Sequence, residues 1–389
     1  MNLEERIVRR QRPDSEPRLV LESDALNPIA HPTEPVGRGL VIEQLLDALD
    51  PAFDDRCPPD CYVWGPKGAG KSAIVRSLFA QLDRLIGRAH GRIYTTTRTQ
   101  PTADIAFVYT DGRVAKTGFA LLHTVLNNLT ADPVPKQGLS ADTIRHRLAD
   151  RLDPGSRSVV VAVDHVGEPE TLSAEAVAEQ FAPFGESVSL VLCGRQEPAA
   201  VTGPLTDPET VRCDAYRRHT LIEILTSRGA DGLTRSAISH ERIRELAGWA
   251  DGDAHDALAA LFSAGLDAQR RGHDRIDTDA LEAGTDAVPK PCVSLGRLLA
   301  LPESRQRILG RLVDLPETAR NSVRAAADAI AGDRIDLSRS TIERVLYELA
   351  EAGIVRRLKV EGDSHIGRPP SRLEPRFPTL VFDHLTTAN

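Results

Sequence analysis

A glycine-rich stretch near residue 65 has residue types and spacing that suit the binding of phosphate groups. A short apolar run, Tyr62–Trp64, is followed by a turn that closes on Gly-Lys-Ser, which is the spacing of a phosphate-binding loop. Glycines in the turn let the backbone curl until successive N–H groups converge on an anion. The lysine can reach the β- and γ-phosphates, and the serine hydroxyl can ligate Mg²⁺. We therefore predict that ATP or ADP, with Mg²⁺, binds at Gly65, Pro66, Lys67, Gly68, Ala69, Gly70, Lys71, Ser72 and Ala73.

An aspartate at the end of a second apolar run is the next candidate. Val159–Val163 is continuously apolar, which is typical of a strand covered on both faces, and Asp164 follows it directly. Downstream of a phosphate-binding loop, such an aspartate is expected to hold Mg²⁺ together with Ser72. A hydrolytic site of this type usually has a glutamate next, to polarise the attacking water, but this chain has His165 there, and Glu168 lies beyond that position. The predicted catalytic residues are Lys71, Asp164 and His165.

Apolar runs that alternate with amphipathic segments predict the elements that position these side chains. The predicted strands are 62–64, 105–109, 159–163 and 188–193, and predicted helices begin near residues 40, 71 and 118. This alternation implies a mostly parallel sheet with helices on both sides, and ligands then bind at the carboxyl ends of the strands. We predict an α/β P-loop NTPase base over 31–214, preceded by a flexible N-terminal arm over 1–30.

The second half of the chain reads as two further units. From Arg217 onward the pattern becomes helical, which predicts a small helical lid over 215–290. The last unit is predicted over 297–389. It has predicted helices over 305–315 and 317–331, and a third that begins near Ser338 or Ser340. Ser340 and Glu343 have the spacing of a capping box at the start of this third helix. Predicted strands over 354–360 and roughly 373–382 follow. Three helices and a hairpin in this order predict a C-terminal winged helix-turn-helix domain.

Basic and hydroxyl side chains gather on the third helix and on the hairpin of this last unit. The start of such a helix commonly meets base edges in the major groove of DNA, and an arginine on a hairpin could enter a minor groove. The predicted DNA-binding residues are Arg339, Ser340, Thr341, Arg344, Arg368 and Arg372. The alternative is that this winged helix docks a protein partner.

Charge and composition limit the classes of protein to which this chain could belong. The net charge is −8, yet residues 290–389 carry 16 Lys and Arg against 13 Asp and Glu, so the acidic total does not argue against DNA binding. The Lys-poor, Asp-rich composition resembles proteins of salt-loving archaea, although a GC-rich genome would also favour Arg over Lys. There is no secretory signal, no apolar run of membrane-spanning length and no cysteine spacing for zinc. We expect a cytoplasmic, nucleoid-associated protein without a membrane partner.

The order of these parts resembles the archaeal origin-recognition initiators, which are AAA+ ATPases related to eukaryotic origin-recognition and helicase-loading factors. The resemblance covers about Asn27 to Phe382, and it rests on the segment 27–38, the loop at 65–72, the lid opening at 216–230, the Gly-Asp-Ala-His at 252–255 and the C-terminal unit. It implies that the nucleotide also contacts Val36, Gly37, Arg38, Tyr216 and His255.

Departures from the family pattern bear on hydrolysis. His165 replaces the expected glutamate, and His255 replaces an arginine that reaches the γ-phosphate. Cys193–Gln196 stands where the family has a Ser-Asn sensor, and Arg212 is a weak candidate for an arginine finger. Nucleotide binding does not depend on these positions, whereas fast hydrolysis does.

The resemblance implies an ATP-binding replication initiator that recognises origin duplex DNA, uses ATP and Mg²⁺ as a conformational switch and hydrolyses ATP slowly. A replicative helicase would be a further partner. One alternative built from the same motifs is a nucleotide-gated transcriptional or plasmid-maintenance regulator. The other is an active remodelling ATPase, against which the missing glutamate argues.

Overall fold

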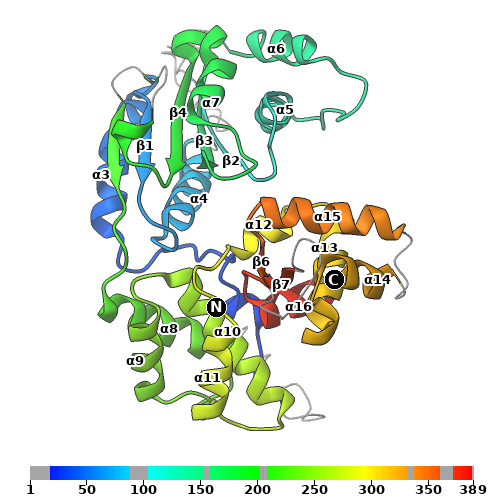
Figure 1. The fold of residues 1–389 in the computed structure, drawn as a ribbon. Coiled ribbons are helices and arrows are strands. Elements are labelled where there is room, and N and C mark those ends of the chain that lie inside the picture. The colour runs from blue at the N-terminus through cyan, green and yellow to red at the C-terminus, as the bar shows by residue number, and fades with distance from the viewer. Residues whose placement is uncertain are drawn as a thin grey trace. The chain divides into compact units, whose positions relative to one another are not determined.

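The computed structural model describes residues 18–87, 104–152, 157–201, 205, 208–331, 337–359 and 371–387. The chain divides into two compact units, which Figure 1 shows as ribbons. One unit is His31–Tyr216, and the other joins the described part of Met1–Ala30 to that of Arg217–Asn389. None of the helices in the described part of the chain is long and apolar enough to cross a membrane.

The unit His31–Tyr216 is built on a five-stranded sheet in the order β2-β3-β4-β1-β5, in which every neighbouring pair is parallel. The strands are β1 (Cys61–Trp64), β2 (Asp104–Asp111), β3 (Arg157–Val166), β4 (Val188–Gly194) and β5 (Glu209–Arg212). Four of them confirm predicted strands. The edge strand β5 was not predicted, because Val211 is the one apolar residue in its Glu-Thr-Val-Arg sequence.

Helices cover both faces of this sheet, as Figure 1 shows. Successive strand side chains point to opposite faces, so Val160 and Ala162 of β3 join one buried apolar cluster while Val159, Val161 and Val163 join the other. The first cluster includes α3 (Gly39–Leu49) and α4 (Lys71–Leu82), and the second includes α5 (Gly118–Asn128), α6 (Ala141–Ala149) and α7 (Ala174–Phe181). Short 3₁₀ or π turns complete this unit: η1 (Asp50–Asp54), η2 (Asp83–Gly87), η4 (Ala182–Ser187) and η5 (Pro198–Ala200).

After Tyr216 the chain continues in the other unit with a run of helices, as predicted. Its first helices are α8 (Arg218–Gly232), α9 (His240–Trp249), α10 (Ala254–Arg270), α11 (Thr278–Asp286) and the short α12 (Leu295–Leu299). Helix α10 is buried along most of its length, because α8, α9, α11 and two further helices described below pack around it. Its N-terminus is capped by the Asp253 carboxylate, which accepts a hydrogen bond from the backbone N–H of Asp256.

Residues 19–30 are not a flexible arm, so that prediction is wrong for the described part of the arm. Leu19, Val20 and Leu26 are buried, Val20 forms an antiparallel bridge with Leu233, and α2 (Ser23–Leu26) packs on α8. The guanidinium of Arg228 in α8 donates hydrogen bonds to the backbone carbonyls of Asp24, Ala25, Asn27 and Ala30. Residues 1–17 of the predicted arm lie outside the described residues.

The C-terminal elements follow the predicted order with three corrections. They are α13 (Glu303–Asp314), η6 (Glu317–Arg320), α14 (Val323–Ala331), α15 (Arg339–Glu351), the antiparallel pair β6 (Val355–Lys359) and β7 (Ser371–Pro375), and α16 (Thr379–Thr387). The predicted helix over 317–331 begins as a 3₁₀ turn. Ser338 rather than Ser340 caps α15, since its hydroxyl accepts from the Thr341 N–H. The predicted strand over 373–382 ends at Pro375, and a new helix follows Pro378, whose ring lacks an N–H for a strand ladder.

Candidate functional site

Strand β1 and helix α4 position the predicted phosphate-binding loop. The strand ends at Trp64 and the helix begins at Lys71, so the loop occupies the carboxyl edge of the sheet. Gly65, Gly68 and Gly70 have φ angles of 147°, 69° and 82°, which side-chain-bearing residues rarely adopt. A Cβ on Gly65 would lie 2.0 Å from the carbonyl oxygen of Cys213. The loop therefore needs glycine for its conformation and, at residue 65, for space.

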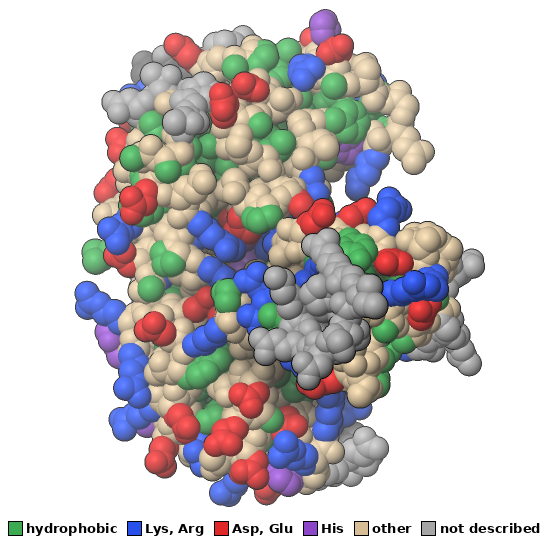
Figure 2. Space-filling view, viewed as in Figure 1, with side chains coloured by type: hydrophobic (Ala, Val, Ile, Leu, Met, Phe, Trp, Pro, Cys, Tyr) green, Lys and Arg blue, Asp and Glu red, His purple; other side chains and the backbone are tan. Residues whose placement is uncertain are grey.

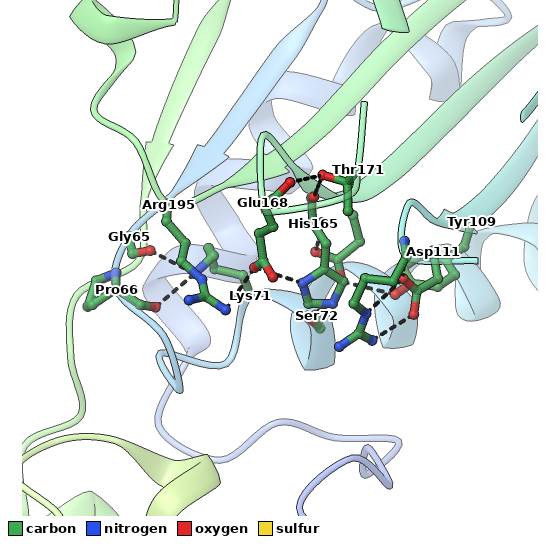
Figure 3. Close-up of polar contacts among 12 residues, drawn as sticks. Gly65, Pro66, Lys71, Ser72, Tyr109, Asp111, His165, Glu168, Thr171 and Arg195 are labelled. Carbon is green, nitrogen blue, oxygen red and sulfur yellow. Dashed lines mark hydrogen bonds and ion pairs between the residues drawn. The ribbon is translucent and has the colours of Figure 1, made fainter. Parts of the chain in front are cut away.

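Lys71 is buried at the start of α4 and faces back into the loop. Its Nζ donates hydrogen bonds to the carbonyl oxygens of Gly65 (2.7 Å) and Pro66 (2.8 Å), as Figure 3 shows. Burial lowers the pKa of the Lys71 ammonium and nearby Arg195 adds to this, whereas Asp164 acts in the opposite direction. An ammonium group has three donors, so one N–H remains for an anion in the loop. This arrangement fits a phosphate group.

Asp164 is fully buried in β3 and surrounded by donors. The Tyr109 hydroxyl donates to its Oδ2 (2.9 Å), and the backbone N–H of His165 donates to its Oδ1 (2.8 Å). Burial alone would raise the pKa of this carboxyl, but His165, a hydrogen bond from Ser72, Arg113 and Tyr109 together lower it to about 2. Asp164 is thus a carboxylate at neutral pH, and it lies next to the hydroxyl oxygen of Ser72. Oxygen ligands of this kind suit Mg²⁺.

A β-bulge brings His165 to the same place as Asp164. The register of β3 against β4 shifts between Val163 and Val166, and His165 has a φ of +63°. Consecutive residues of a regular strand point to opposite faces, and a bulge re-aims one of them. The Nε2 of His165 lies 3.4 Å from Asp164 Oδ2 and 3.5 Å from Ser72 Oγ. The structure therefore brings the predicted residues Lys71, Ser72, Asp164 and His165 together.

Glu168 and Arg195 complete this group, and sequence reasoning did not assign them a role. Glu168 is buried, and its Oε1 lies 3.1 Å from Nδ1 of His165 and 2.9 Å from the guanidinium of Arg195 (Figure 3). The Thr171 hydroxyl holds this turn by donating to the carbonyls of His165 and Glu168, at 2.8 Å each. Burial alone would raise the pKa of Glu168, but the His165 hydrogen bond and the charges of His165, Arg195 and Arg113 lower it below its ordinary value.

The neighbouring strand β2 contributes side chains that sequence reasoning also missed. Tyr109 binds Asp164 as described, and Arg113 pairs with Asp111 through two contacts of 2.6 and 3.0 Å. The available signal was their position, because β2 lies beside β3 and its carboxyl end meets the same edge of the sheet.

Arg38 and Tyr216 lie beside the loop, as the resemblance implied. Arg38 is buried directly before α3, its guanidinium lies 3.6 Å from the centre of the Tyr216 ring, and its Nη2 donates to the Asp214 carbonyl (2.7 Å). A Cβ on Gly70 would lie 2.4 Å from the Tyr216 hydroxyl, so this ring rests against the loop. The Nε of Arg38 is buried and has no hydrogen-bond partner among the described residues. Val36 and Gly37 precede Arg38 directly, and Gly37 has a φ of +67°.

His255 is hydrogen-bonded at both ring nitrogens, and its contact with the nucleotide stays a prediction. It lies in the other unit, at the start of α10, where its Nδ1 is 3.0 Å from Asp256 Oδ1 and its Nε2 accepts the backbone N–H of Leu295 (3.1 Å). Both ring nitrogens are therefore engaged within that unit. His255, Asp256 and Cys292 could in principle hold a metal ion, since their ligand atoms lie within 4.8 Å of one another.

The described DNA-binding candidates lie at the start of α15 and on β7. Arg339, Ser340 and Thr341 open α15, Arg344 follows, and Arg372 is on β7. Arg368 lies outside the described residues. Figure 2 shows basic and acidic side chains interspersed over the C-terminal elements.

Each described arginine of this set has an acidic partner. Arg339 Nε lies 2.7 Å from Asp328 Oδ1, and Arg344 Nη1 lies 3.5 Å from Glu348 Oε1. Arg372 pairs with Glu374 and lies 3.6 Å from Glu317. Such exposed ion pairs contribute little to stability, because water and salt screen them. A phosphate group of DNA could therefore replace any of these carboxylates at low cost.

Comparison with known proteins agrees with this architecture. Residues 34–192 match the family model of the AAA ATPase domain. The ORC1-type DNA replication protein 6 of Halobacterium salinarum is 24% identical to this chain over 332 residues, which cover 81% of this chain and 82% of that protein.

Solved structures show the same fold over nearly the whole length. The structure of the Aeropyrum pernix ORC1 protein in complex with DNA has a TM-score of 0.61 and 18% identity, and the match covers 95% of this chain and 97% of that one. The Aeropyrum pernix ORC2 protein in its ADPNP–ADP complexes has a TM-score of 0.52 and 17% identity, with 95% and 99% covered. Residues 34–192 thus form an AAA ATPase domain, and the chain as a whole is similar to archaeal ORC1-type DNA replication proteins.

Proposed function

We propose that this protein is an ATP-binding DNA replication initiator that recognises origin duplex DNA through a C-terminal winged helix. The observation that carries the proposal is the convergence of Lys71, Ser72 and Asp164 at one edge of the sheet, in a chain related to ORC1-type replication proteins. The similar solved structures include one complex with DNA and one with nucleotides. The proposal is that the present chain binds the same two kinds of ligand.

The nucleotide would lie along the loop, with its phosphates on Lys71 and Mg²⁺ on Ser72 and Asp164. Mg²⁺ would supply neutralisation of the phosphate charge. Lys71 keeps one donor for the phosphates, and Asp164 is ionised and faces the Ser72 hydroxyl. Arg38 and Tyr216, which stack beside the loop, are the residues we assign to the base of the nucleotide, together with Val36 and Gly37.

The nucleotide would act mainly as a conformational switch, because the site is poorly equipped to activate water. The position after Asp164 holds His165, whose Nδ1 is already occupied by Glu168 and whose Nε2 lies near Asp164 and Ser72. A glutamate at residue 165 would instead offer a free carboxylate oxygen to a water molecule. We expect ATP to bind and to be hydrolysed slowly.

DNA binding would reside in the C-terminal elements. Helices α13, α14 and α15 followed by the β6–β7 pair have the order of a winged helix-turn-helix, with α15 as the recognition helix. Ser340 and Thr341 lie at its exposed start, together with Arg339. From the similarity to ORC1-type DNA replication proteins, we also propose that the protein associates with the nucleoid and that a replicative helicase is a further partner.

A nucleotide-gated transcriptional or plasmid-maintenance regulator would use the same site and the same DNA-binding unit. Mapping where the protein lies on its genome, by crosslinking and sequencing, separates the two. Enrichment at a replication origin is the expected result. Enrichment at scattered promoters, with no signal at an origin, would replace the initiator by the regulator.

A further inference from the structure

His165 follows Asp164 directly in the chain, and its imidazole lies against that carboxylate. In a regular strand the two side chains would point to opposite faces of the sheet. The shift in the register of β3 between Val163 and Val166, with a φ of +63° at His165, turns the imidazole back. A left-handed backbone is unfavourable for a residue that carries a side chain, and such residues are common at functional sites. The bulge thus places an imidazole beside the oxygen ligands proposed for the cation of the nucleotide.

A buried carboxylate fixes the orientation of this ring. Oε1 of Glu168 lies 3.1 Å from Nδ1 of His165, and the side chains of Glu168 and His165 are only 8% and 13% exposed. Figure 3 shows the ring with Glu168 on one side and Ser72 on the other. Because the Glu168 carboxylate accepts the N–H of Nδ1, the lone pair of the neutral ring is at Nε2. A carboxylate in this position is the usual second partner of a metal-binding histidine.

The Nε2 atom has the spacing of a metal ligand relative to the two oxygen atoms that it faces. It lies 3.4 Å from Oδ2 of Asp164 and 3.5 Å from Oγ of Ser72. Both distances exceed the roughly 2.7–3.2 Å of an ordinary N–H···O hydrogen bond. Two ligands that are each about 2.1 Å from one cation lie about 3.0–3.4 Å apart, from octahedral to tetrahedral geometry. The three atoms are therefore close to the arrangement in which they could share one ion.

We propose that His165 is a nitrogen ligand for the cation that accompanies the nucleotide, and that the site therefore prefers a divalent transition-metal ion such as Mn²⁺ to Mg²⁺. Mg²⁺ takes oxygen ligands, whereas the affinity of mixed nitrogen and oxygen sites rises along the transition-metal series. The imidazole thus adds affinity for a transition-metal ion and little for Mg²⁺. A lone pair engaged in this way is also not available to take a proton from water, in keeping with slow hydrolysis. This inference rests on the proposed function, since it takes the nucleotide and its cation to bind at the loop over 65–72.

The test is a titration of full-length protein with Mn²⁺ in the presence of ADP, followed by electron paramagnetic resonance, and a second titration in which Mg²⁺ displaces the bound Mn²⁺. For the wild-type protein we expect a preference for Mn²⁺ greater than that of free ADP, and modulation of the electron spin echo by an imidazole nitrogen bound to Mn²⁺.

For His165→Gln we expect this nitrogen modulation to disappear and the affinity for Mn²⁺ to fall at least about 10-fold, because even the second partners of a metal-binding histidine contribute that much. The affinity for Mg²⁺ should stay within about 3-fold, since oxygen atoms are its ligands. For Glu168→Gln, which frees the ring, we expect a smaller loss of affinity for Mn²⁺ and none for Mg²⁺. His146→Gln, at an exposed histidine of α6, is the matched control and should change neither affinity.

Three outcomes overturn the inference, and they can be told apart. If the wild-type protein binds ADP but shows no nitrogen modulation, or if His165→Gln keeps the modulation, His165 is not a ligand. If His165→Gln weakens both cations equally, His165 supports the site without selecting the ion. If the wild-type protein does not bind ADP with either cation, the proposed function fails and this inference fails with it. Should circular dichroism show that His165→Gln is unfolded, Glu168→Gln decides the question, and an unchanged ratio of the two affinities overturns the inference.

Discussion

At the scale of single residues, the candidate site is a balance of two cations and two anions at one edge of a sheet. Lys71 is bound to carbonyl oxygens of its own loop, and Arg195 is bound to Glu168. Asp164 keeps its charge because donors from three directions offset the cost of burial. A nucleotide with Mg²⁺ would bring net negative charge, because one divalent cation offsets only part of the charge of the phosphates. The third N–H of the Lys71 ammonium faces that charge.

The first prediction concerns the lysine of the loop. Lys71→Ala removes the buried ammonium that faces the phosphates, so ATP binding should weaken by about 2–4 kcal/mol, the scale of one or two charged hydrogen bonds. Isothermal titration calorimetry measures this directly. Lys136→Ala, at an exposed lysine outside the site, is the control. Equal ATP affinity of the wild-type protein and Lys71→Ala would show that this loop does not bind the phosphates.

The second prediction concerns hydrolysis. His165→Glu supplies the carboxylate that the position lacks, and phosphate release should become faster. Glu168 is buried nearby, and its charge would oppose the new one, so His165→Glu combined with Glu168→Gln should be faster still. His146→Glu on α6 is the control and should behave as wild type. Fast multiple-turnover hydrolysis by the wild-type protein would show that His165 already suffices.

Much of the site could be predicted residue by residue, and what could not depended on three-dimensional contacts. The loop and Asp164 follow from spacing and from an apolar run, both of which are local. Glu168 and Arg195 belong to separate segments, and only the β3 bulge and the end of β4 bring them together. His255 has contacts that a motif resemblance does not reveal, because its ring nitrogens are hydrogen-bonded to Asp256 and Leu295.

At the scale of elements, one side chain of α8 binds the backbone of residues 24–30. Arg228 donates to four carbonyl groups of residues 24–30, which otherwise would need water as their partner. Burial lowers the pKa of this guanidinium, an effect that Asp231 opposes. Arg228 thus adds a polar anchor to the apolar packing and the backbone bridge that hold the described N-terminal segment.

The third prediction follows from that arrangement. Arg228→Ala should reduce the free energy of unfolding by about 2–4 kcal/mol, because several hydrogen bonds to a charged group are lost. It should also expose residues 18–30 to proteolysis. Thermal unfolding and limited thermolysin digestion are the measurements, because thermolysin cleaves before the apolar residues of this segment, and Arg235→Ala on the surface of the same unit is the control. A digestion pattern identical to wild type would mean that the apolar contacts of Leu19, Val20 and Leu26 hold the segment without Arg228.

Strong local patterns predicted elements well, and weak ones did not. Strand β3 was predictable because its apolar run is long and buried on both faces. Strand β5 was missed because it has a single buried residue. The start of helix α16 was assigned to a strand because the apolar pattern of β7 continues into it. The N-terminal segment was missed because its few apolar residues gain order only from packing on α8 and α10.

At the scale of the whole molecule, an acidic chain is proposed to bind an acidic polymer. The net charge of −8 is unevenly distributed, and the C-terminal hundred residues are basic. Salt screens distant charges, with a Debye length of about 3 Å at 1 M ionic strength, so local arginines decide the contact. These arginines are paired with carboxylates in the free protein: Arg339 pairs with Asp328, and Arg372 pairs with Glu374. DNA binding would exchange these partners for phosphates and bases.

The fourth prediction separates two kinds of DNA contact. Arg372→Ala should weaken binding to all sequences alike and reduce the slope of log K against log salt by about one unit. Arg339→Ala should instead cost about 1–3 kcal/mol on the cognate site and little on random DNA. Competition titrations on both duplexes over a salt series measure the two effects. Identical behaviour of the two variants would contradict the assignment of base readout to α15.

The most direct test of the central claim is the binding of full-length protein to duplex DNA, measured by fluorescence anisotropy with ATP and Mg²⁺ present. The probes are a duplex from the origin region found by genome mapping and a random duplex of the same length. The account predicts tighter binding to the origin duplex, a steep salt dependence and an affinity that changes when ADP replaces ATP. Failure to bind either duplex at moderate salt, by a protein that binds ATP, would contradict it and leave the C-terminal unit as a protein-docking surface.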